Sequence, residues 1–291
     1  MGSTDETRHQ RAILTTRPVL VAVVSDIHNG STLAACPPEG VILDDGGRFL
    51  PSALQVWIWE RWEKFWGTVG QRQRETDAEL WVVMNGDLFE GAHHGTTQIV
   101  SGNPESQAYL ATRTFGIPLA LKPLHLFVVR GTEAHVGPSG ATEEQFAAKI
   151  KAEKNEETGR WSWWHLRLAP HGCRLDFQHH PSTRGALPWT RPQAAQRLAF
   201  RIWSEHALRD IPYPHYAFRS HLHVHSDSEK AYPTRAIITP AWQAKTAHAH
   251  KVASDSIADM GGLMLLVQPD GSSNLETVLY APDLPKTWEP A

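Results

Sequence analysis

The sequence predicts a layered α/β fold with a mixed β-sheet, and two features of the chain predict it. Apolar segments rich in β-branched residues alternate with helical segments in the first half, and pairs of hairpin-like segments follow in the second half. The 291 residues suffice for a large core, and 41% hydrophobic with 20% charged residues is typical of globular proteins. Because no repeat or long linker divides the sequence, we expect a flexible tail at residues 1–17 and a single domain at 18–291, with an insertion at about 31–70.

The expected strands of the first half are continuous apolar runs. Residues 19–25, 80–84 and 124–129 read VLVAVVS, LWVVM and LHLFVV, as expected of strands that are buried on both faces. Shorter strands are expected in the second half, at residues 161–168, 174–178, 216–219, 236–239, 263–268 and 275–280. A small hairpin is expected from residues 41–43 and 48–50, because two aspartates and two glycines lie between them.

Helices are expected where apolar residues recur at three- and four-residue spacing. The expected helices cover residues 52–69, 104–121, 142–154 and 193–208. The first of them carries four tryptophans, namely Trp57, Trp59, Trp62 and Trp66. This stripe fits either a core face or a platform on which nucleic-acid bases stack, and we favour the core.

Charge, cysteine content and the N-terminal segment exclude several classes of protein. The net charge of −3 removes the simplest electrostatic case for strong non-specific nucleic-acid binding. The two cysteines, Cys36 and Cys173, are far apart, which excludes a disulfide framework and a cysteine-based zinc site. Residues 1–14 are polar and contain no apolar segment of a signal peptide, and the run at 19–24 is far too short to span a membrane. We therefore expect a cytoplasmic protein without a membrane partner.

Five segments each deliver acidic or histidine side chains, and each follows or lies at the end of an apolar strand. The pairs and triplets are Asp26 and His28, Asp87 and Glu90, Glu133 and His135, His179 and His180, and His221, His223 and His225. Open α/β sheets bind ligands beyond the carboxyl ends of their strands, so these side chains are expected to meet. Imidazoles and carboxylates are ligands of divalent metals, and without thiolates Mn²⁺, Fe, Zn²⁺ or Mg²⁺ is expected.

The order of these segments resembles the calcineurin-like metallophosphoesterases. The matching stretches read SDIHNG, NGDLFEG, RGTEAH, QHHP and RSHLHVH, and the resemblance covers about residues 18–282. In detail the chain is most similar to phage- or prophage-type members, which would place it in the cytoplasm of a host cell. The resemblance implies a four-layer αββα sandwich with mixed β-sheets and two metal ions at the strand ends, with Mn²⁺ expected first.

The resemblance also implies which residues hold the two ions. The first ion would be held by Asp26, His28, Asp87 and His223, and the second by Asp87 as a bridge with His179 and His221. His179 and His180 compete for one ligand position. We favour His179, which comes first after the strand, and give His180 a role facing the phosphate. Two such ions would lower the pKa of a bridging water, and the resulting hydroxide would attack the phosphorus.

The third motif departs from the family pattern. The family has Gly-Asn-His, with asparagine as a ligand and histidine as the acid, whereas this chain has Gly131-Thr132-Glu133-Ala134-His135. Threonine is a poor ligand. Two registers remain open: Glu133 is a metal ligand and His135 the acid, or Glu133 takes the position of the acid. We favour the first register.

These residues predict a metal-dependent phosphoesterase, and more specifically a phosphodiesterase acting on a nucleotide or on DNA, with a nuclease included. His94 is expected to line the substrate pocket, although an exposed loop explains it equally well. The alternative is a phosphoesterase fold that has lost turnover and serves as a binding or structural protein, which the altered third motif favours. The sequence has no phosphate-binding GxxxxGK[ST] loop, HExxH or GxSxG motif.

Overall fold

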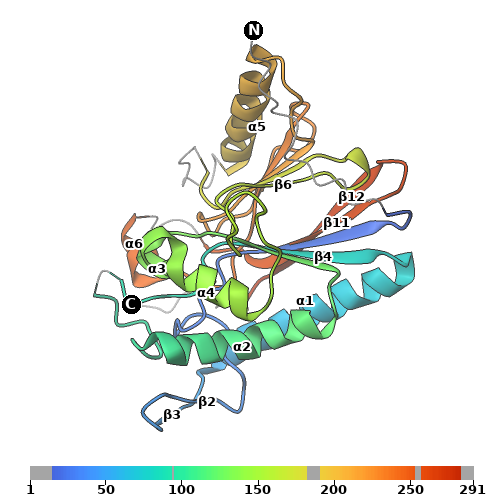
Figure 1. The fold of residues 1–291 in the computed structure, drawn as a ribbon. Coiled ribbons are helices and arrows are strands. Elements are labelled where there is room, and N and C mark those ends of the chain that lie inside the picture. Colours follow the sequence, from blue (N-terminus) through green and yellow to red (C-terminus); the bar gives the residue numbers. More distant parts are fainter. Residues whose placement is uncertain (1–14, 94, 182–190, 253–256, 283–291) are drawn as a thin grey trace, which may run out of the picture.

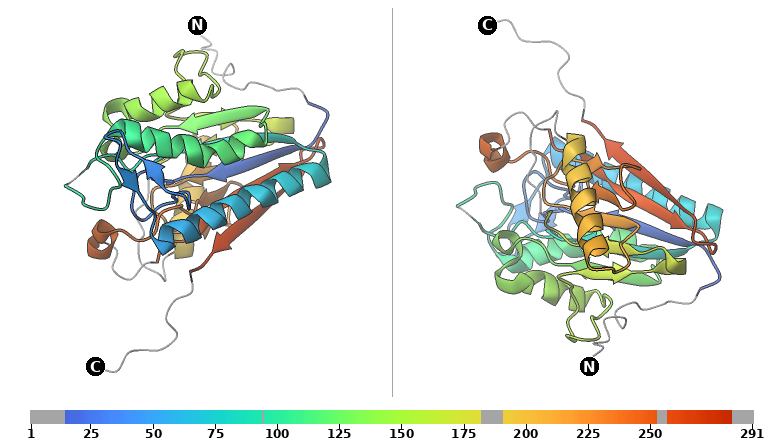
Figure 2. Two further views of the ribbon diagram at one scale, coloured as in Figure 1. Left: turned by 90° about the horizontal axis from the view of Figure 1, so that it is seen from below. Right: turned by 90° about the horizontal axis from the view of Figure 1, so that it is seen from above.

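Two five-stranded sheets pack face to face, and helices cover the outer face of each (Figure 1). The computed structural model describes residues 15–93, 95–181, 191–252 and 257–282. Helices α1 (Ala53–Thr76) and α2 (Pro104–Ala120) lie across the first sheet, and α5 (Arg191–Leu208) covers the second, as the views from below and above show (Figure 2). The predicted four-layer αββα sandwich is confirmed.

The first sheet combines three parallel strands with an antiparallel hairpin. Its order is β12-β11-β1-β4-β5. The strands are β1 (Val19–Val24), β4 (Glu79–Asn85), β5 (His125–Val129), β11 (Met260–Val267) and β12 (Ser273–Tyr280). Strands β1, β4 and β5 are parallel, and β11 and β12 are antiparallel to their neighbours. The carboxyl ends of β1, β4 and β5 therefore meet at one edge.

The second sheet is also mixed, in the order β6-β7-β8-β10-β9. Its strands are β6 (Leu166–Leu168), β7 (Leu175–Phe177), β8 (Tyr216–Arg219), β9 (Ser226–Asp227) and β10 (Arg235–Ile238). The three central strands β7, β8 and β10 are parallel, and the edge strands β6 and β9 are antiparallel to them. A separate small hairpin consists of β2 (Val41–Ile42) and β3 (Arg48–Phe49).

Strand β1 is buried along its whole length because both of its faces pack against other layers. Its even-numbered residues, such as Leu20, belong to the core shared with the helices. Its odd-numbered residues, such as Val21, belong to the core between the sheets, where Phe177 and Phe218 stack with ring centroids 4.7 Å apart. The alternation of side chains along a strand thus fills two cores at once.

The tryptophan stripe of α1 lies in the core between the helices and the first sheet. Trp59, Trp62 and Trp66 are each at most 6% exposed, which confirms the core interpretation. Helix α1 starts at a capping box between Ser52 and Gln55. Of the insertion expected at 31–70, the hairpin β2–β3 projects beyond the helices (Figure 1), while α1 contributes to the main core.

The element boundaries differ from expectation at several places, and local contacts explain two of them. Only the end of the strand expected at 161–168 forms β6, because Trp163 instead pairs with the end of β5 at Val129. Strand β11 begins earlier than expected and includes Gly262, where a side chain would collide with the ring of Phe65. The short helices α3 (Glu133–Val136) and α6 (Ala247–Val252) were not expected, and α4 (Ala141–Lys149) ends before 154. No helix within the described ranges is both long and apolar enough to cross a bilayer.

Candidate metal centre

The loops after four parallel strands meet at one end of the sandwich, where backbone hydrogen bonds hold them together. The amide of Asp26, after β1, donates to the carbonyl of Gly86, after β4, at 2.9 Å. Across the two sheets, the amide of His221 donates to Oδ2 of Asp26 at 3.2 Å. Within the second sheet, the amide of Ser220 donates to the carbonyl of His179 at 2.7 Å. The carboxyl ends of both sheets therefore form one continuous site.

A first group of ligand atoms comes from Asp26, His28 and His223. Nε2 of His223 lies 3.2 Å from Oδ1 of Asp26 and 3.2 Å from Nε2 of His28. Asp26 and His28 are at most 1% exposed, whereas His223 is half-buried. These are the three residues that the motifs at β1 and β8 assign to the first ion, and the structure brings them together.

A second group surrounds Asp87. Nε2 of His179 lies 3.0 Å from Oδ2 of Asp87, and Nδ1 of His221 lies 4.0 Å from the same oxygen. Asp87 also approaches His28 of the first group, with ligand atoms of the two residues within 4.8 Å of each other. Asp87 is therefore within reach of both groups, and its bridging role stays a prediction.

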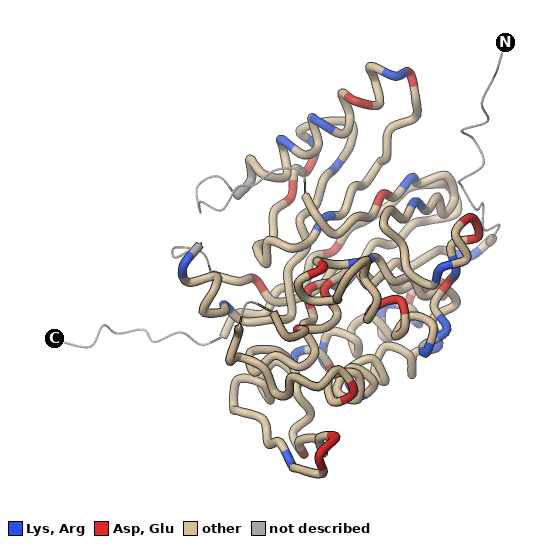
Figure 3. Tube along the Cα trace, turned by 60° about the vertical axis from the view of Figure 1, so that its left-hand side comes forward, with Lys and Arg blue, Asp and Glu red and all other residues tan. Residues whose placement is uncertain are grey.

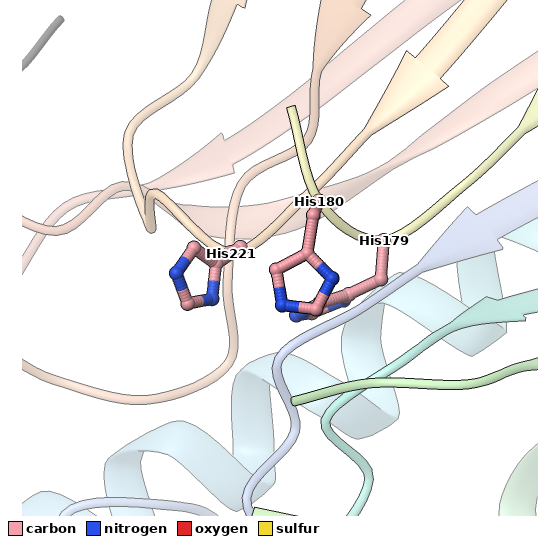
Figure 4. Close-up of side chains that lie close together, drawn as sticks. All are labelled: His179, His180 and His221. Carbon is pink, nitrogen blue, oxygen red and sulfur yellow. The ribbon is translucent and has the colours of Figure 1, made fainter. Parts of the chain in front are cut away.

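Three histidines line the second group, as the close-up in Figure 4 shows. His179 and His180 follow β7, and His221 follows β8; the ring centroid of His180 lies 4.8 Å from each of the other two. His179 is buried at 1% exposure, whereas His180 is exposed. The structure thus brings His179 to Asp87 and leaves His180 at the exposed side of the group.

The backbone at the site is strained. Asp26, His28 and Asp87 have φ angles of 50°, 48° and 53°, and His221 and His223 have 72° and 54°. Non-glycine residues seldom adopt this left-handed region, and such strain clusters at functional sites. Five of the twelve described non-glycine residues with positive φ are predicted metal ligands. The fold therefore holds these side chains in an arrangement that local backbone preferences do not favour.

The donor set fits divalent metal ions. Metal–ligand distances of about 2.0–2.2 Å place neighbouring ligand atoms about 3.0–3.5 Å apart. His223 has this spacing from Asp26 and from His28, and His179 has it from Asp87, whereas His221 lies farther out, 4.0 Å from Asp87. Oδ1 of Asp26 is buried and receives no hydrogen bond of acceptable geometry from any described residue. Nδ1 of His179 donates to the carbonyl of Asn85 at 2.7 Å, which fixes the ring so that Nε2 faces Asp87 and becomes a metal ligand once it loses its proton. We conclude that the site suits a cation rather than a closed hydrogen-bond network.

The pKa values of the site residues also indicate a place for cations. Burial would raise the pKa values of Asp26 and Asp87, but the neighbouring histidines outweigh it and hold both well below the usual range. Burial would lower the pKa of His179, yet the charges of Asp87 and Asp26 raise it to about 10. Burial likewise opposes the raised pKa of His28, which Glu90 causes. Without metal, the histidine protons thus compensate the carboxylates, a role that bound cations would take over.

The third motif forms a turn of helix, so its residues point in different directions. The amide and the hydroxyl of Thr132 donate to Asp87, at 2.5 Å to Oδ1 and 3.1 Å to Oδ2. His135 faces the site, with its ring centroid 4.6 Å from that of His28. Glu133 is exposed, and its Oε1 accepts a hydrogen bond from the amide of Ser139 at 3.1 Å. The structure therefore brings His135, and not Glu133, to the predicted ligands.

Glu90 connects the first group to its surroundings, although the sequence analysis assigns it no role of its own. Its Oε2 lies 3.0 Å from Nδ1 of His28 and accepts a hydrogen bond from Nε2 of Gln243 at 2.7 Å. A carboxylate at Nδ1 fixes the ring of a ligating histidine and directs Nε2 toward the metal. The charges around it, mainly that of His28, overcome burial and lower the pKa of Glu90 to about 2.

A second carboxylate that sequence reasoning missed, Glu143, holds the second and third motifs in place. This fully buried residue of α4 accepts hydrogen bonds from the amides of Leu88, at 3.0 Å, and Gly131, at 2.6 Å. Burial and the nearby charge of Asp87 raise its pKa to about 7. Gly131 must approach closely, since a Cβ atom there would lie 2.1 Å from Oδ1 of Asp87. A glutamate on the same helix face as Phe146 and Ala147 is the sequence signal that would have found it.

Replacing Glu143 with alanine is expected to destabilise the metal-free protein by about 2–6 kcal/mol. The substitution leaves two buried amides without an acceptor, and each such loss costs about 1–3 kcal/mol. Urea denaturation of the EDTA-treated protein measures this change without any contribution from bound metal. Glu143→Gln, which retains one acceptor oxygen, should lose less. A free energy of unfolding unchanged in Glu143→Ala would show that these two hydrogen bonds do not stabilise the loops.

The predicted substrate-binding residues lie partly outside what the structure describes. His94 is outside the described residues. His180 lies at the exposed side of the second group, with Nε2 3.1 Å from Oγ1 of Thr132. Partial burial and the charges of His179 and His221 lower the pKa of His180 to about 4, so the ring is neutral at pH 7.

Comparison with solved structures gives matches of low similarity. The NAD nucleotidase NadN of Haemophilus influenzae matches with a TM-score of 0.40 and 8% identity, over 90% of this chain and 50% of that chain. The sulfate thiohydrolase SoxB of Thermus thermophilus gives 0.41 and 11%, over 92% and 57%. A dimetal phosphatase of Danio rerio gives 0.41 and 10%, over 90% and 99%. This chain thus spans about half the length of the first two proteins.

No protein-family model matches the sequence, and no curated protein matches it. Identities of 8–11% with TM-scores near 0.4 assign neither a family nor an activity to the chain. The four-layer fold and the His/Asp site rest on the contacts described above.

Proposed function

We propose that the chain is a metal-dependent phosphoesterase that hydrolyses a phosphodiester of a nucleotide or nucleic acid. The observation that carries the proposal is the pair of adjacent ligand groups, one at Asp26, His28 and His223 and the other at Asp87, with His179 at 3.0 Å and His221 at 4.0 Å from its Oδ2. The presence of dimetal and nucleotide-acting enzymes among the structural matches agrees with it, although these matches are too distant to carry it. The phage-type origin suggested by the motifs stays a prediction.

Different residues would bind the metal ions, position the metal ligands and bind the phosphate. Two divalent ions held by these groups, with Mn²⁺ expected first, would polarise a phosphate and lower the pKa of a bound water. Asp87 lies between the groups and holds them at a fixed separation, while Thr132 fixes both oxygens of Asp87. We assign to His180, which is exposed and neutral, a hydrogen bond to a phosphate oxygen.

His135 is the group that we assign to protonating the leaving oxygen. Its Nδ1 donates to the carbonyl of Glu90 at 2.8 Å, which fixes the ring and leaves Nε2 for proton transfer. In the protein without substrate, burial and the charge of His28 lower the pKa of His135 to about 4. The negative charge of a bound phosphodiester raises this pKa, so the ring gains its proton together with the substrate.

The distribution of charge favours a short substrate over a long duplex. In the trace of Figure 3, Lys and Arg are interspersed with Asp and Glu. Together with the net charge of −3, this mixture offers weak attraction for a long phosphate backbone. A nucleotide-sized diester, or a single strand bound at its end, needs no extended basic groove.

The test is a comparison of kcat/KM for an aryl phosphodiester, the matching monoester and single-stranded DNA with Mn²⁺. We expect the diester to be hydrolysed faster than the monoester, because the diester brings one negative charge fewer close to the buried carboxylates of Asp26, Asp87 and Glu90. A strong preference for the monoester would overturn the proposed substrate class. Inertness toward all three, in protein that contains two ions per chain, would favour the alternative of a binding or structural protein.

A further inference from the structure

A third group of metal-ligating side chains lies beside the two groups of the proposed phosphoesterase site. It consists of Glu90, His93 and His135, whose ligand atoms all lie within 4.8 Å of one another. Glu90 is 2% exposed, and the other two are half-buried. None of the three is among the residues to which we assign the first two ions.

The geometry points to a third metal site, and we propose that Glu90, His93 and His135 bind a zinc-type divalent cation that withdraws His135 from proton transfer. One carboxylate and two imidazoles with an open fourth position are a common protein ligand set for zinc. The inhibitory part of this proposal rests on the proposed function, because it requires His135 to be the acid.

The two carboxylate oxygens of Glu90 lie next to different histidines, so Glu90 can orient His28 and bind a third cation at the same time. Oε2 lies 3.0 Å from Nδ1 of His28, whereas Oε1 lies 3.1 Å from Nε2 of His93. The second distance matches the roughly 3.0–3.5 Å between neighbouring ligand atoms of one metal ion. Glu90 can therefore bind a cation through Oε1 while Oε2 continues to orient His28.

Within the third group, His135 is the residue next to the first group. Its ring centroid is 4.3 Å from that of His93 and 4.6 Å from that of His28. Nδ1 of His135 donates to the carbonyl of Glu90, so Nε2 is the nitrogen that would bind the ion. The use of Nε2 as a ligand would remove the proton donor from the leaving oxygen.

The experiment is a count of bound metal in the full chain and in His93→Ala, with His250→Ala as the matched control. His250 is an exposed histidine of α6 outside all three groups. After equilibration with excess Zn²⁺ and gel filtration, we expect three ions per chain in the unmodified protein and in His250→Ala, and two in His93→Ala. Anomalous scattering at the zinc edge should show the third ion at Nε2 of His93. Two ions in the unmodified protein, or a third ion that survives His93→Ala, would overturn the site.

The inhibitory role is measured separately on an alkyl diester, whose leaving group needs a proton. Going from Mn²⁺ alone to Mn²⁺ with excess Zn²⁺ should reduce kcat of the unmodified protein by about 10²-fold or more, the usual contribution of a general acid. In His93→Ala, kcat with Mn²⁺ alone and kcat with Mn²⁺ plus excess Zn²⁺ should be about equal. If His93→Ala loses the third ion but zinc slows it as much as the unmodified protein, the inhibitory role is overturned. If the unmodified protein binds three ions but is inactive under every condition, the proposed function fails instead.

Discussion

The variant Asp87→Asn is expected to lose metal from both halves of the site together, and its kcat/KM should fall by at least about 10³-fold. Removal of a single stabilising donor in an active site costs about 10²–10³-fold, and this change affects two ions at once. Metal content after Mn²⁺ loading and gel filtration should fall from two ions per chain to well below one. The same preparations serve for the rate measurement.

The position of Asp87 gives the physical reason. Its side chain lies 3.0 Å from His179 of the second group and shares a ligand cluster with His28 of the first. An asparagine amide carries no charge and offers only one oxygen, so it neutralises neither ion fully and cannot join them. His223→Ala, by contrast, removes a ligand from the first group only, and one ion should remain.

Asp176→Asn is the matched control for loss of a buried carboxylate. Asp176 is 4% exposed and lies 2.7 Å from Nη2 of Arg219 in the second sheet, outside all described ligand groups. We expect this variant to lose stability but to keep two ions. If Asp87→Asn kept one ion at full occupancy, Asp87 would belong to one half only, and the bridging role would be wrong.

The main strands and helices were predictable because burial on two faces leaves a clear mark in the sequence. A strand such as β1 that lies between two layers must be apolar at every position, and its end is marked by the first charged residue, Asp26. The short elements were not predictable. Helices α3 and α6 have four and six residues, and tertiary contacts rather than apolar periodicity stabilise elements of this length.

The sequence predicts which candidate ligands come together wherever it predicts the strand that precedes them. Residues directly after a buried parallel strand have a known position, which is why Asp26, Asp87 and His179 were found. The supporting contacts of Glu143 and Thr132 join segments far apart in the chain, such as Glu143 to Leu88, and although the helix face marks Glu143 as buried, no local pattern identifies the partners. The direction of a side chain outside a strand depends on the backbone, and the third motif illustrates this.

Replacing His135 with alanine is expected to reduce kcat on an alkyl diester by about 10²–10⁴-fold, the usual contribution of a general acid. The loss should be smaller on a nitrophenyl diester, whose leaving group departs without a proton. Two Mn²⁺ ions per chain should remain, because neither proposed group contains His135. Loss of an ion in His135→Ala would instead assign this residue to one of the two groups as a ligand.

Glu133→Ala is the variant that separates the two registers of the third motif. Two residues in an extended segment point the same way, but at about 100° per residue in a helix they lie about 200° apart, on opposite sides. Residues 133–136 form the helical turn α3, so His135 faces the ligands while Glu133 turns outward to the amide of Ser139. We therefore expect Glu133→Ala to keep both ions and to change kcat less than twofold. A loss of metal from this variant would restore Glu133 as a ligand, and a slow variant with full metal content would make Glu133 the acid in place of His135.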